Sequence, residues 1–373
     1  MDANEFVNGL KECGVGLFTG VPDSLLKPFC DALSGSPIHF AAANEGSAVG
    51  IAAGYNMSTG KIPCVYMQNS GIGNAVNPIT SLTSPDVYGI PTIFVIGWRG
   101  EPGVKDEPQH VMQGKVTIEE LKVLNVETMV IDGSTEIKDV LGWISSMRVN
   151  LSQGNSIALV VRKGALTGSI KEEENDENGI KRESVIECIV KAAGDDVIVT
   201  TTGKTSRELF EVREHLKHDH SHDFLTVGSM GHSSMIALGI SMSRDVGVWC
   251  IDGDGAVFMH MGALATIGAN SPKKFIHVVV NNSAHESVGG MPTTNTKFNF
   301  SKIAEVCGYK HAFRVSDYTQ LKSVLSGVKS KTGPIMIEVI AVTGSRADLG
   351  RPTTTTKENK EELMKYLRRF DEL

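Results

Sequence analysis

Short apolar runs alternate along the chain with longer segments in which apolar residues recur every three or four positions. Runs of the first kind are typical of buried strands, and segments of the second kind are typical of helices that cover a sheet. In the first half this pattern predicts strands at residues 14–19, 38–42, 63–68, 90–97, 126–131 and 156–162. It predicts helices at 2–12, 22–33, 46–59, 117–124 and 134–148, and a long polar loop at 98–115. Strands that alternate with helices favour a parallel sheet covered on both faces.

The second half repeats this alternation after a polar run at residues 171–182, which is rich in Glu, Asn and Asp and has almost nothing to bury. The pattern predicts strands at 196–201, 224–227, 246–251, 275–280, 309–314 and 334–340, and helices at 183–193, 204–217, 231–243, 257–269, 299–307, 317–329 and 357–370. We therefore predict an α/β protein of two doubly wound parallel-sheet domains, residues 1–165 and 183–373, joined by a linker at 166–182. The linker leaves no room for a third, central domain.

The strongest chemical signal is a GDG sequence at residues 253–255 with paired asparagines at 281 and 282. Asp254 follows one predicted strand and Asn282 follows the next, so both should lie at the sheet edge where ligands bind. A carboxylate, an amide oxygen and a backbone carbonyl suit Mg²⁺, and a glycine such as Gly255 lets the backbone approach a phosphate. GDG alone would also fit a plain turn. The 25 residues between Gly255 and Asn281, with suitable elements at each place, favour a site for a metal and a diphosphate.

Composition and charge limit the classes of function. The chain has 373 residues, of which 41% are hydrophobic and 21% charged, as in globular proteins. Its net charge of −7 disfavours a nucleic-acid binder, and no apolar run approaches the length of a membrane span. The N-terminus lacks the basic region and apolar core of a signal peptide, and the six cysteines are scattered without a CxxC motif. We therefore expect a protein of the reducing cytoplasm.

A glycine loop at residues 71–74 allows a competing interpretation, a dinucleotide-binding site. Its GxGN spacing differs from GxGxxG, and the next strand ends at Gly97-Trp98-Arg99 rather than in an acid that could bind a ribose. An NAD-dependent oxidoreductase and a non-catalytic nucleotide-binding subunit are therefore disfavoured alternatives.

The GDG sequence and the asparagine pair at this spacing resemble the cofactor signature of enzymes that use thiamin diphosphate (ThDP). The resemblance implies that Asp254, the Asn282 side chain and the Ala284 carbonyl hold Mg²⁺ against the diphosphate. It also implies cofactor contacts from loops that follow predicted strands, namely Thr202, Gly203, Gly228, Met230, Gly253, Gly255 and Ala256.

Two residues of the first half are candidates for proton transfer. Glu45 ends a buried strand and opens a small-residue helix, where desolvation should raise the pKa of its carboxyl. A carboxylate stabilised by the helix dipole would occupy the same position. The resemblance implies that Glu45 bonds the aminopyrimidine ring of ThDP. His110 fits a plain surface histidine, but related decarboxylases carry active-site histidines in this region, so it is a candidate proton donor after CO₂ departs.

Three longer motifs resemble the phosphonopyruvate decarboxylase family and, nearby, the sulfopyruvate decarboxylases, which are often split into two subunits. They are TGVPDS at residues 19–24, DEPQH at 106–110 and NSAHESVGG at 282–290. The resemblance implies decarboxylation of 3-phosphonopyruvate, a small anionic 2-keto acid, to phosphonoacetaldehyde and CO₂, with ThDP and Mg²⁺. It also implies at least a homodimer with the active site between chains. The single fused chain favours the phosphonate over the sulfonate substrate.

A phosphonate carries about two negative charges, so its recognition needs local cations or hydroxyl groups. The candidates lie in loops after predicted strands. Each cation alone also fits a solvated surface charge. The candidates are Asp23, Ser24, Arg99, Lys105, Lys297, Arg346 and Arg351.

Overall fold

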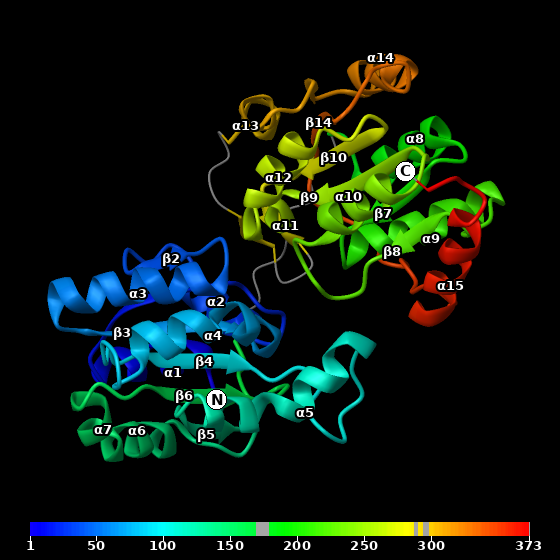
Figure 1. Ribbon diagram of the computed structural model, residues 1–373. Helices are drawn as coiled ribbons and strands as arrows, with labels where there is room; N and C mark the ends of the chain where they lie inside the picture. The colour runs from blue at the N-terminus through cyan, green and yellow to red at the C-terminus, as the bar shows by residue number, and fades with distance from the viewer. Residues whose placement is uncertain (169–178, 287–289, 294–297, 373) are drawn as a thin grey trace. The chain divides into compact units, whose positions relative to one another are not determined.

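The computed structural model describes residues 1–168, 179–286, 290–293 and 298–372, and the chain divides into two compact units, Met1–Glu172 and Glu173–Leu373. Each unit is built on a six-stranded parallel sheet with helices on both faces (Figure 1). This is the α/β, doubly wound architecture that the alternating pattern predicts. Most of the predicted linker at 166–182 lies outside the described residues.

The first unit has the strand order β2-β1-β3-β4-β6-β5. Its strands are β1 (Val15–Gly20), β2 (His39–Ala41), β3 (Ile62–Gln68), β4 (Ile93–Gly97), β5 (Glu127–Ile131) and β6 (Ile157–Val161). Helices α3 (Glu45–Thr59), α4 (Ile72–Pro78) and α5 (Pro108–Val123) pack on one face through an aliphatic core. On the other face lie α1 (Ala3–Glu12) and α2 (Lys27–Leu33), where Phe29 packs against Phe18 and Tyr66 of the sheet and against Phe6 of α1. Helix α6 (Ile137–Ser146) packs beside α1, and α7 (Arg148–Ser152) follows it.

The second unit has the order β13-β14-β10-β9-β7-β8, which is the same topology when strands are counted within each unit. The strands are β7 (Val197–Thr200), β8 (Asp223–Leu225), β9 (Val248–Gly253), β10 (Phe275–Asn281), β13 (His311–Val315) and β14 (Ile335–Ile340). Helices α8 (Arg182–Ala193), α9 (Lys204–Leu216) and α14 (Tyr318–Val328) cover one face. The other face carries α10 (Ser233–Ser243), α11 (Asp254–Met259), α12 (Gly262–Asn270), α13 (Phe300–Cys307) and α15 (Thr356–Leu367).

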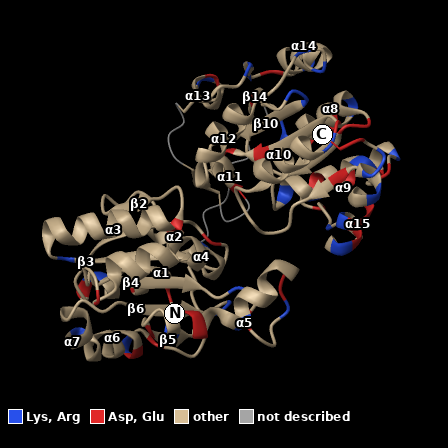
Figure 2. Ribbon diagram, in the orientation of Figure 1, with Lys and Arg blue, Asp and Glu red and all other residues tan. Residues whose placement is uncertain are grey.

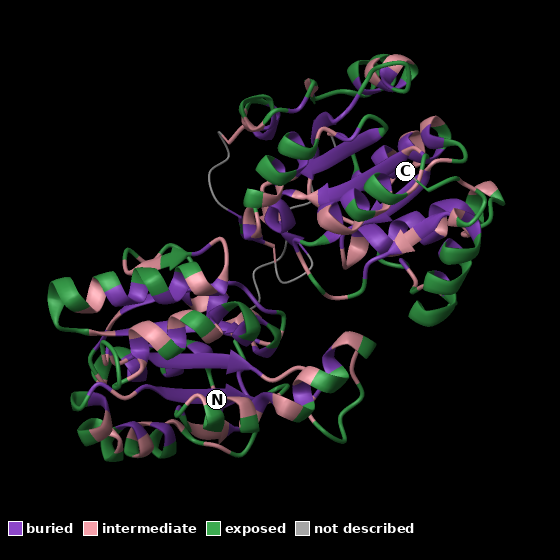
Figure 3. Cartoon of the chain, viewed as in Figure 1, coloured by how far each residue is buried: buried purple, intermediate pink, exposed green. Residues whose placement is uncertain are grey.

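Burial explains why the strands are the elements most easily predicted from the sequence. Strands β4 and β6 are buried at every position, because helices cover both faces of the sheet. The central strands are accordingly purple in Figure 3, while Lys, Arg, Asp and Glu in Figure 2 lie mostly on helices and loops. None of the helices in the described part of the chain combines the length and apolar content needed to cross a membrane.

Several sequence-based expectations differ from the structure in detail. Helix α5 begins at Pro108 rather than at residue 117, so His110 lies on a helix and not in a long polar loop. The predicted helix at 257–269 is two helices, α11 and α12, with a break at His260. Helix α4, a π-helical turn at Ile79–Thr83 and a short antiparallel pair, β11 (Ala284–His285) with β12 (Met291–Pro292), were not predicted.

The first part of helix α5, before residue 117, escaped prediction because its buried face is not apolar. The buried positions are His110, Gly114, Thr117 and Leu121, which recur at helical spacing but include only one aliphatic residue. Proline at the first helical position fixes φ without losing a needed N–H donor, so the helix can start there.

Candidate active site

Asp254 lies at the carboxyl end of β9, as the first residue of α11, and its side chain is buried. The Thr293 hydroxyl donates a hydrogen bond to Asp254 Oδ2 over 2.7 Å. Burial raises the pKa of Asp254 to about 6, although hydrogen bonds from Thr293 and from backbone N–H groups, including that of Asn282, oppose the rise. Within the described residues, no Lys or Arg forms an ion pair with this carboxylate. A buried anion held only by neutral donors suits a hard divalent cation.

Asn282 follows β10, and the register of β10 on β9 pairs Val280 with Gly253. Its Nδ2 donates to Glu286 Oε2 over 2.8 Å, while its Oδ1 accepts the Ala284 N–H at 3.2 Å. These contacts fix which way the amide faces. Asp254 and Asn282 therefore lie together at one sheet edge, as predicted, and offer the oxygen donors that Mg²⁺ prefers.

Glu286 belongs to a network of four charged side chains at this edge. Arg182 donates to both oxygens of Glu208, at 2.6 and 2.7 Å, and to Glu286 at 2.6 Å. Lys204, the first residue of α9, reaches Glu286 over 3.0 Å. Burial raises the pKa of Glu286, but the charges of Arg182 and Lys204 outweigh it and the net shift is downward. Arg182 ends the polar run that was predicted to bury almost nothing, yet it is only 6% exposed.

The remaining predicted cofactor residues lie at the same edge, either in the loops after β7 and β8 or where β9 meets α11. The Gly228 N–H donates to Thr202 Oγ1 over 3.0 Å, so the loops after β7 and β8 are joined. Gly203 and Gly228 have φ values of 95° and 74°, which favour glycine. Met230 is half-buried. Gly253, Gly255 and Ala256 surround Asp254, and a Cβ at Gly255 would lie 2.8 Å from His285 Nδ1, so only glycine fits there.

Glu45 opens α3 in the first unit and is 4% exposed. Asn74 Nδ2 donates to Glu45 Oε2 over 2.8 Å. Burial raises the pKa of Glu45, and the Asn74 bond opposes the rise only in part. A Cβ at Gly71 would lie 2.4 Å from Glu45 Oε1, so glycine at 71 makes room for the carboxyl group. A buried carboxyl group with a raised pKa is suited to exchange a proton with a ring nitrogen.

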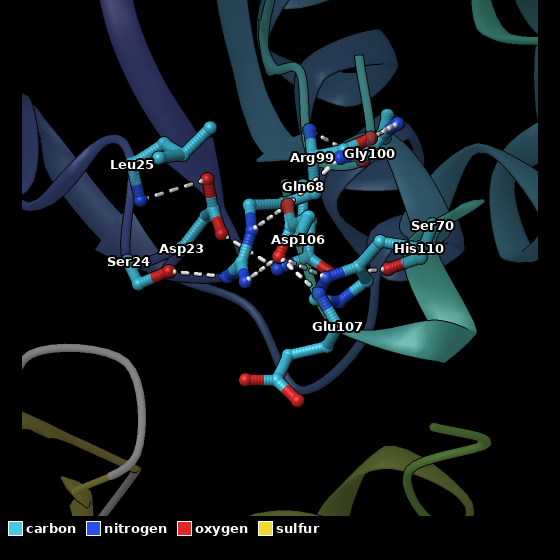
Figure 4. Close-up of polar contacts among 11 residues, drawn as sticks. Asp23, Ser24, Leu25, Gln68, Ser70, Arg99, Gly100, Asp106, Glu107 and His110 are labelled. Carbon is cyan, nitrogen blue, oxygen red and sulfur yellow. Dashed lines mark hydrogen bonds and ion pairs between the residues drawn. The ribbon is translucent and has the colours of Figure 1, made fainter. Parts of the chain in front are cut away.

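A second polar cluster of the first unit joins the ends of β1, β3 and β4 to the start of α5 (Figure 4). Arg99 binds Asp106 with Nε and Nη2, and its Nη1 donates to Ser24 Oγ over 2.8 Å. His110 Nδ1 lies 3.0 Å from Asp106 Oδ1. Asp23 is fully buried near Arg99. The structure therefore brings His110, a predicted proton donor, together with Asp23, Ser24 and Arg99, which were predicted as candidates for binding the substrate anion.

Asp23 is held by its own set of donors. Gln68 Nε2 donates to its Oδ1 over 2.6 Å, and the Leu25 N–H donates to its Oδ2. Burial raises the pKa of Asp23, while Gln68 and Arg99 oppose the rise. A Cβ at Gly97 would lie 2.1 Å from Asp23 Oδ2, so the close approach depends on glycine.

The other cations that were predicted to bind the substrate anion lie in different surroundings. Lys105 is exposed on the loop before α5. Arg346 is already paired with three carboxylates, those of Glu183, Glu211 and Asp348, and Arg351 is exposed. Lys297 lies outside the described residues. Arg99, by contrast, is joined to the candidate residue Ser24 directly and to His110 through Asp106.

Several residues of these clusters were not predicted as site residues. Asp106 belongs to the DEPQH motif, Glu286 to the NSAHESVGG motif, and Asn74 to the glycine loop at 71–74. The sequence around each of them therefore pointed to a functional site. Gln68 and Thr293 had no such local signal, because their contacts to Asp23 and Asp254 cross 45 and 39 positions of the sequence.

Two family models match the chain. The N-terminal TPP binding domain of thiamine pyrophosphate enzymes matches residues 3–121, and the C-terminal TPP binding domain matches residues 201–339. The phosphonopyruvate decarboxylase of Streptomyces viridochromogenes is 31% identical over 376 residues, covering 95% of this chain and 92% of its own length. The chain belongs to the phosphonopyruvate decarboxylase family. This confirms the resemblance and the use of thiamin diphosphate by the family.

Relatives of the phosphonopyruvate decarboxylase family match parts of the chain. Sulfopyruvate decarboxylase subunit beta of Methanococcus maripaludis is 34% identical over 42% of this chain and 82% of its own length. Sulfopyruvate decarboxylase subunit alpha of Methanothermobacter thermautotrophicus is 30% identical over 43% of this chain and 97% of its own length. Each subunit therefore matches less than half of the chain, as expected for a split relative.

Proposed function

We propose that the chain catalyses the non-oxidative decarboxylation of 3-phosphonopyruvate to phosphonoacetaldehyde and CO₂, with ThDP and Mg²⁺. The observation that carries this proposal is a pair of buried carboxyl groups with raised pKa values, Glu45 and Asp254, in a chain similar along 95% of its length to a phosphonopyruvate decarboxylase. When bound, ThDP supplies the electron sink for loss of CO₂ from the 2-keto acid.

Asp254, the Asn282 side chain and the Ala284 carbonyl are the proposed ligands of Mg²⁺. Their oxygens are hard donors, and the metal would compensate the charge of a carboxylate that is otherwise buried among neutral groups. Thr202, Gly203, Gly228, Met230, Gly253, Gly255 and Ala256 are the proposed cofactor contacts of the same unit.

Glu45 is the proposed acid–base group for the aminopyrimidine ring. Its carboxyl group is desolvated, which favours the protonated form, and Asn74 holds one oxygen in place. A carboxyl group with a raised pKa is better suited to exchange a proton with a ring nitrogen than an exposed carboxylate is.

Arg99 and Ser24 are the proposed ligands of the phosphonate, and His110 is the proposed proton donor after CO₂ departs. Arg99 supplies the positive charge, and the exposed Ser24 accepts a hydrogen bond from it. His110 lies nearby because it bonds the same carboxylate, Asp106, as Arg99 does. Replacement of Arg99 with Met should raise the KM for phosphonopyruvate more than it lowers kcat, whereas Arg346→Met should leave KM unchanged because Arg346 is already neutralised. Equal KM values for both variants and the wild type would mean that the anion is held elsewhere.

Sulfopyruvate is the alternative substrate, because subunits of sulfopyruvate decarboxylase match the chain. CO₂ release should be measured with ThDP and Mg²⁺ on phosphonopyruvate, sulfopyruvate and pyruvate, with Glu45→Gln as the inactive control. The proposal requires the highest kcat/KM on phosphonopyruvate. A higher value on sulfopyruvate would assign the alternative, and no CO₂ from any of the three would refute both.

We further propose a homodimer of the cytoplasm. One chain contains both an N-terminal and a C-terminal TPP binding domain. A dimer would therefore contain two domains of each kind. All six cysteines are free thiols, which suits a reducing compartment. Sedimentation at micromolar concentration tests the assembly, and a monomer that retains full activity would contradict it.

A further inference from the structure

Asp106 is the centre of the polar cluster in the first unit. It lies between β4 and α5 and accepts five hydrogen bonds (Figure 4). Two come from Arg99, two from the backbone N–H groups of Gly100 and Glu107 at 2.8 and 2.7 Å, and one from His110 Nδ1 at 3.0 Å. Five hydrogen bonds hold this carboxylate in one orientation. It can therefore orient the side chains that bind it.

The donors also fix the charge of Asp106. Burial raises the pKa of this carboxyl, but the bonds from Arg99, His110, Glu107 and Gly100 outweigh burial and hold the pKa far below its usual range. Asp106 therefore accepts hydrogen bonds and does not donate them. His110 Nδ1 must carry a proton to bond it, which leaves Nε2 as the ring nitrogen that does not contact Asp106.

The same carboxylate orients Arg99. With Nε and Nη2 bound to Asp106, the guanidinium plane is set and Nη1 reaches the Ser24 hydroxyl. The backbone of Arg99 is held as well, since Asn69 donates to its carbonyl over 2.8 Å and accepts its N–H at 3.2 Å. Nη1 is the part of the guanidinium that can face an anion while the pair with Asp106 stays intact.

We propose that Asp106 is a positioning residue that holds His110 with its proton on Nδ1 and holds Arg99 with Nη1 beside Ser24. One carboxylate thereby aligns the proton donor and the cation of the reaction. The role of these two groups in catalysis rests on the proposed function, but the tautomer of His110 does not.

The first test needs neither cofactor nor substrate. Long-range ¹H–¹⁵N NMR on the full chain labelled with ¹⁵N-histidine reports the tautomer of each neutral ring, and His110→Gln assigns the signal. We expect the Nδ1–H form for His110, whereas a neutral histidine in water carries its proton mainly on Nε2. A wild-type His110 with its proton on Nε2 would overturn the proposal, and this measurement does not depend on whether Asp106→Asn folds.

The second test uses Asp106→Asn, with Asp132→Asn as a matched control from the same unit. Asp132 also accepts several local bonds, from Ser134 and Thr135, but it caps a different loop. Asp106→Asn should lose the Nδ1–H signal of His110 and lower kcat by about 10²-fold or more, the usual contribution of proton transfer. Asp132→Asn should change neither. A normal His110 tautomer in Asp106→Asn would reject the positioning role.

Non-additivity separates positioning from general damage to the fold. If Asp106 acts on kcat through His110, Asp106→Asn should add less than threefold to the kcat loss of His110→Gln, because coupled residues are not additive. A full multiplicative loss in the double variant would mean that Asp106 acts independently of His110. Should the tautomer be as expected while no 2-keto acid is decarboxylated, the proposed function fails and the positioning of His110 stands.

Discussion

Replacement of Arg182 with Met tests whether the buried charge network of the second unit supports both stability and metal binding. Arg182 bonds both oxygens of Glu208 and one of Glu286, and its side chain is 7% exposed. Methionine keeps much of the length and removes the charge, which deprives buried Glu208 of its pair with Arg182 and leaves Glu286 paired with Lys204. Removal of one partner from a buried pair typically costs about 3–5 kcal/mol. For a unit of this size, the Tm should fall by about 6–20 °C.

Metal binding should weaken in the same variant. Glu286 accepts the Asn282 amide, so displacement of Glu286 loosens the orientation of a proposed Mg²⁺ ligand. Loss of such an outer partner typically lowers metal affinity by about 10–100-fold. Calorimetric scans of the apoprotein give the Tm, and titration calorimetry with Mg²⁺ in the presence of ThDP gives the affinity.

Arg213→Met is the matched control. Arg213 is 1% exposed and also bonds both oxygens of one carboxylate, Asp223, at 2.9 and 2.7 Å. It should lower the Tm by a comparable amount and leave Mg²⁺ affinity unchanged, because Asp223 lies on the edge strand β8. A Tm for Arg182→Met within two or three degrees of wild type would refute the energetic reasoning. Equal losses of Mg²⁺ affinity in both variants would refute the link through Glu286.

The pKa of Glu286 adds a pH signature. In the wild type it is lowered, so Glu286 stabilises the fold above its unfolded pKa of about 4.3, and this stabilisation is lost as the pH falls. Without Arg182, burial should dominate and the ionised carboxylate should destabilise the fold instead. The Tm deficit of Arg182→Met should therefore shrink between about pH 8 and about pH 5. A deficit that is equal at both pH values would contradict this sign.

Three further predictions concern the two buried carboxyl groups. Glu45→Gln should lower kcat by about 10²–10⁴-fold with ThDP binding retained, and a variant with more than about a tenth of wild-type kcat would exclude the proton role. Asp254→Ala should weaken ThDP and Mg²⁺ binding together in calorimetry, so unchanged ThDP affinity would remove Asp254 from the metal site. Gly71→Ala should displace Glu45, because the new Cβ would lie 2.4 Å from its Oε1; activity should fall, and wild-type kcat would show that the loop adjusts freely.

The sheets could be predicted from the sequence because their signal is local. Each predicted strand has a counterpart within a few residues, and central strands such as β4 and β6 are continuous apolar runs because helices cover both faces of the sheet. The start of α5 could not be predicted in the same way. Its buried positions include His110, Gly114 and Thr117, and a hydrophobic pattern does not register a face made of polar and small residues.

The sequence predicts where the residues of the candidate site lie in the fold. It does not predict which other residues they contact. Residues such as Asp254 and Asn282 could be placed because each directly follows a strand, and parallel strand ends share one edge. Their partners come from elsewhere in the chain. Asn74 is 29 residues from Glu45, and Ser24 is 75 residues from Arg99, so no local pattern joins them.

Arg182 shows why such partnerships matter for the chemistry. At the end of a polar run, an arginine is normally a surface charge, and the hydrophobic pattern assigns it nothing to contact. Burial becomes tolerable only because Glu208 and Glu286 supply two carboxylates at 2.6 Å, and those residues are 26 and 104 positions away. The same bonds tie α8 and α9 to the segment that orients Asn282. The charge that stabilises the second unit is therefore also the charge that sets the geometry of its proposed metal ligand, and a variant that removes it should impair both.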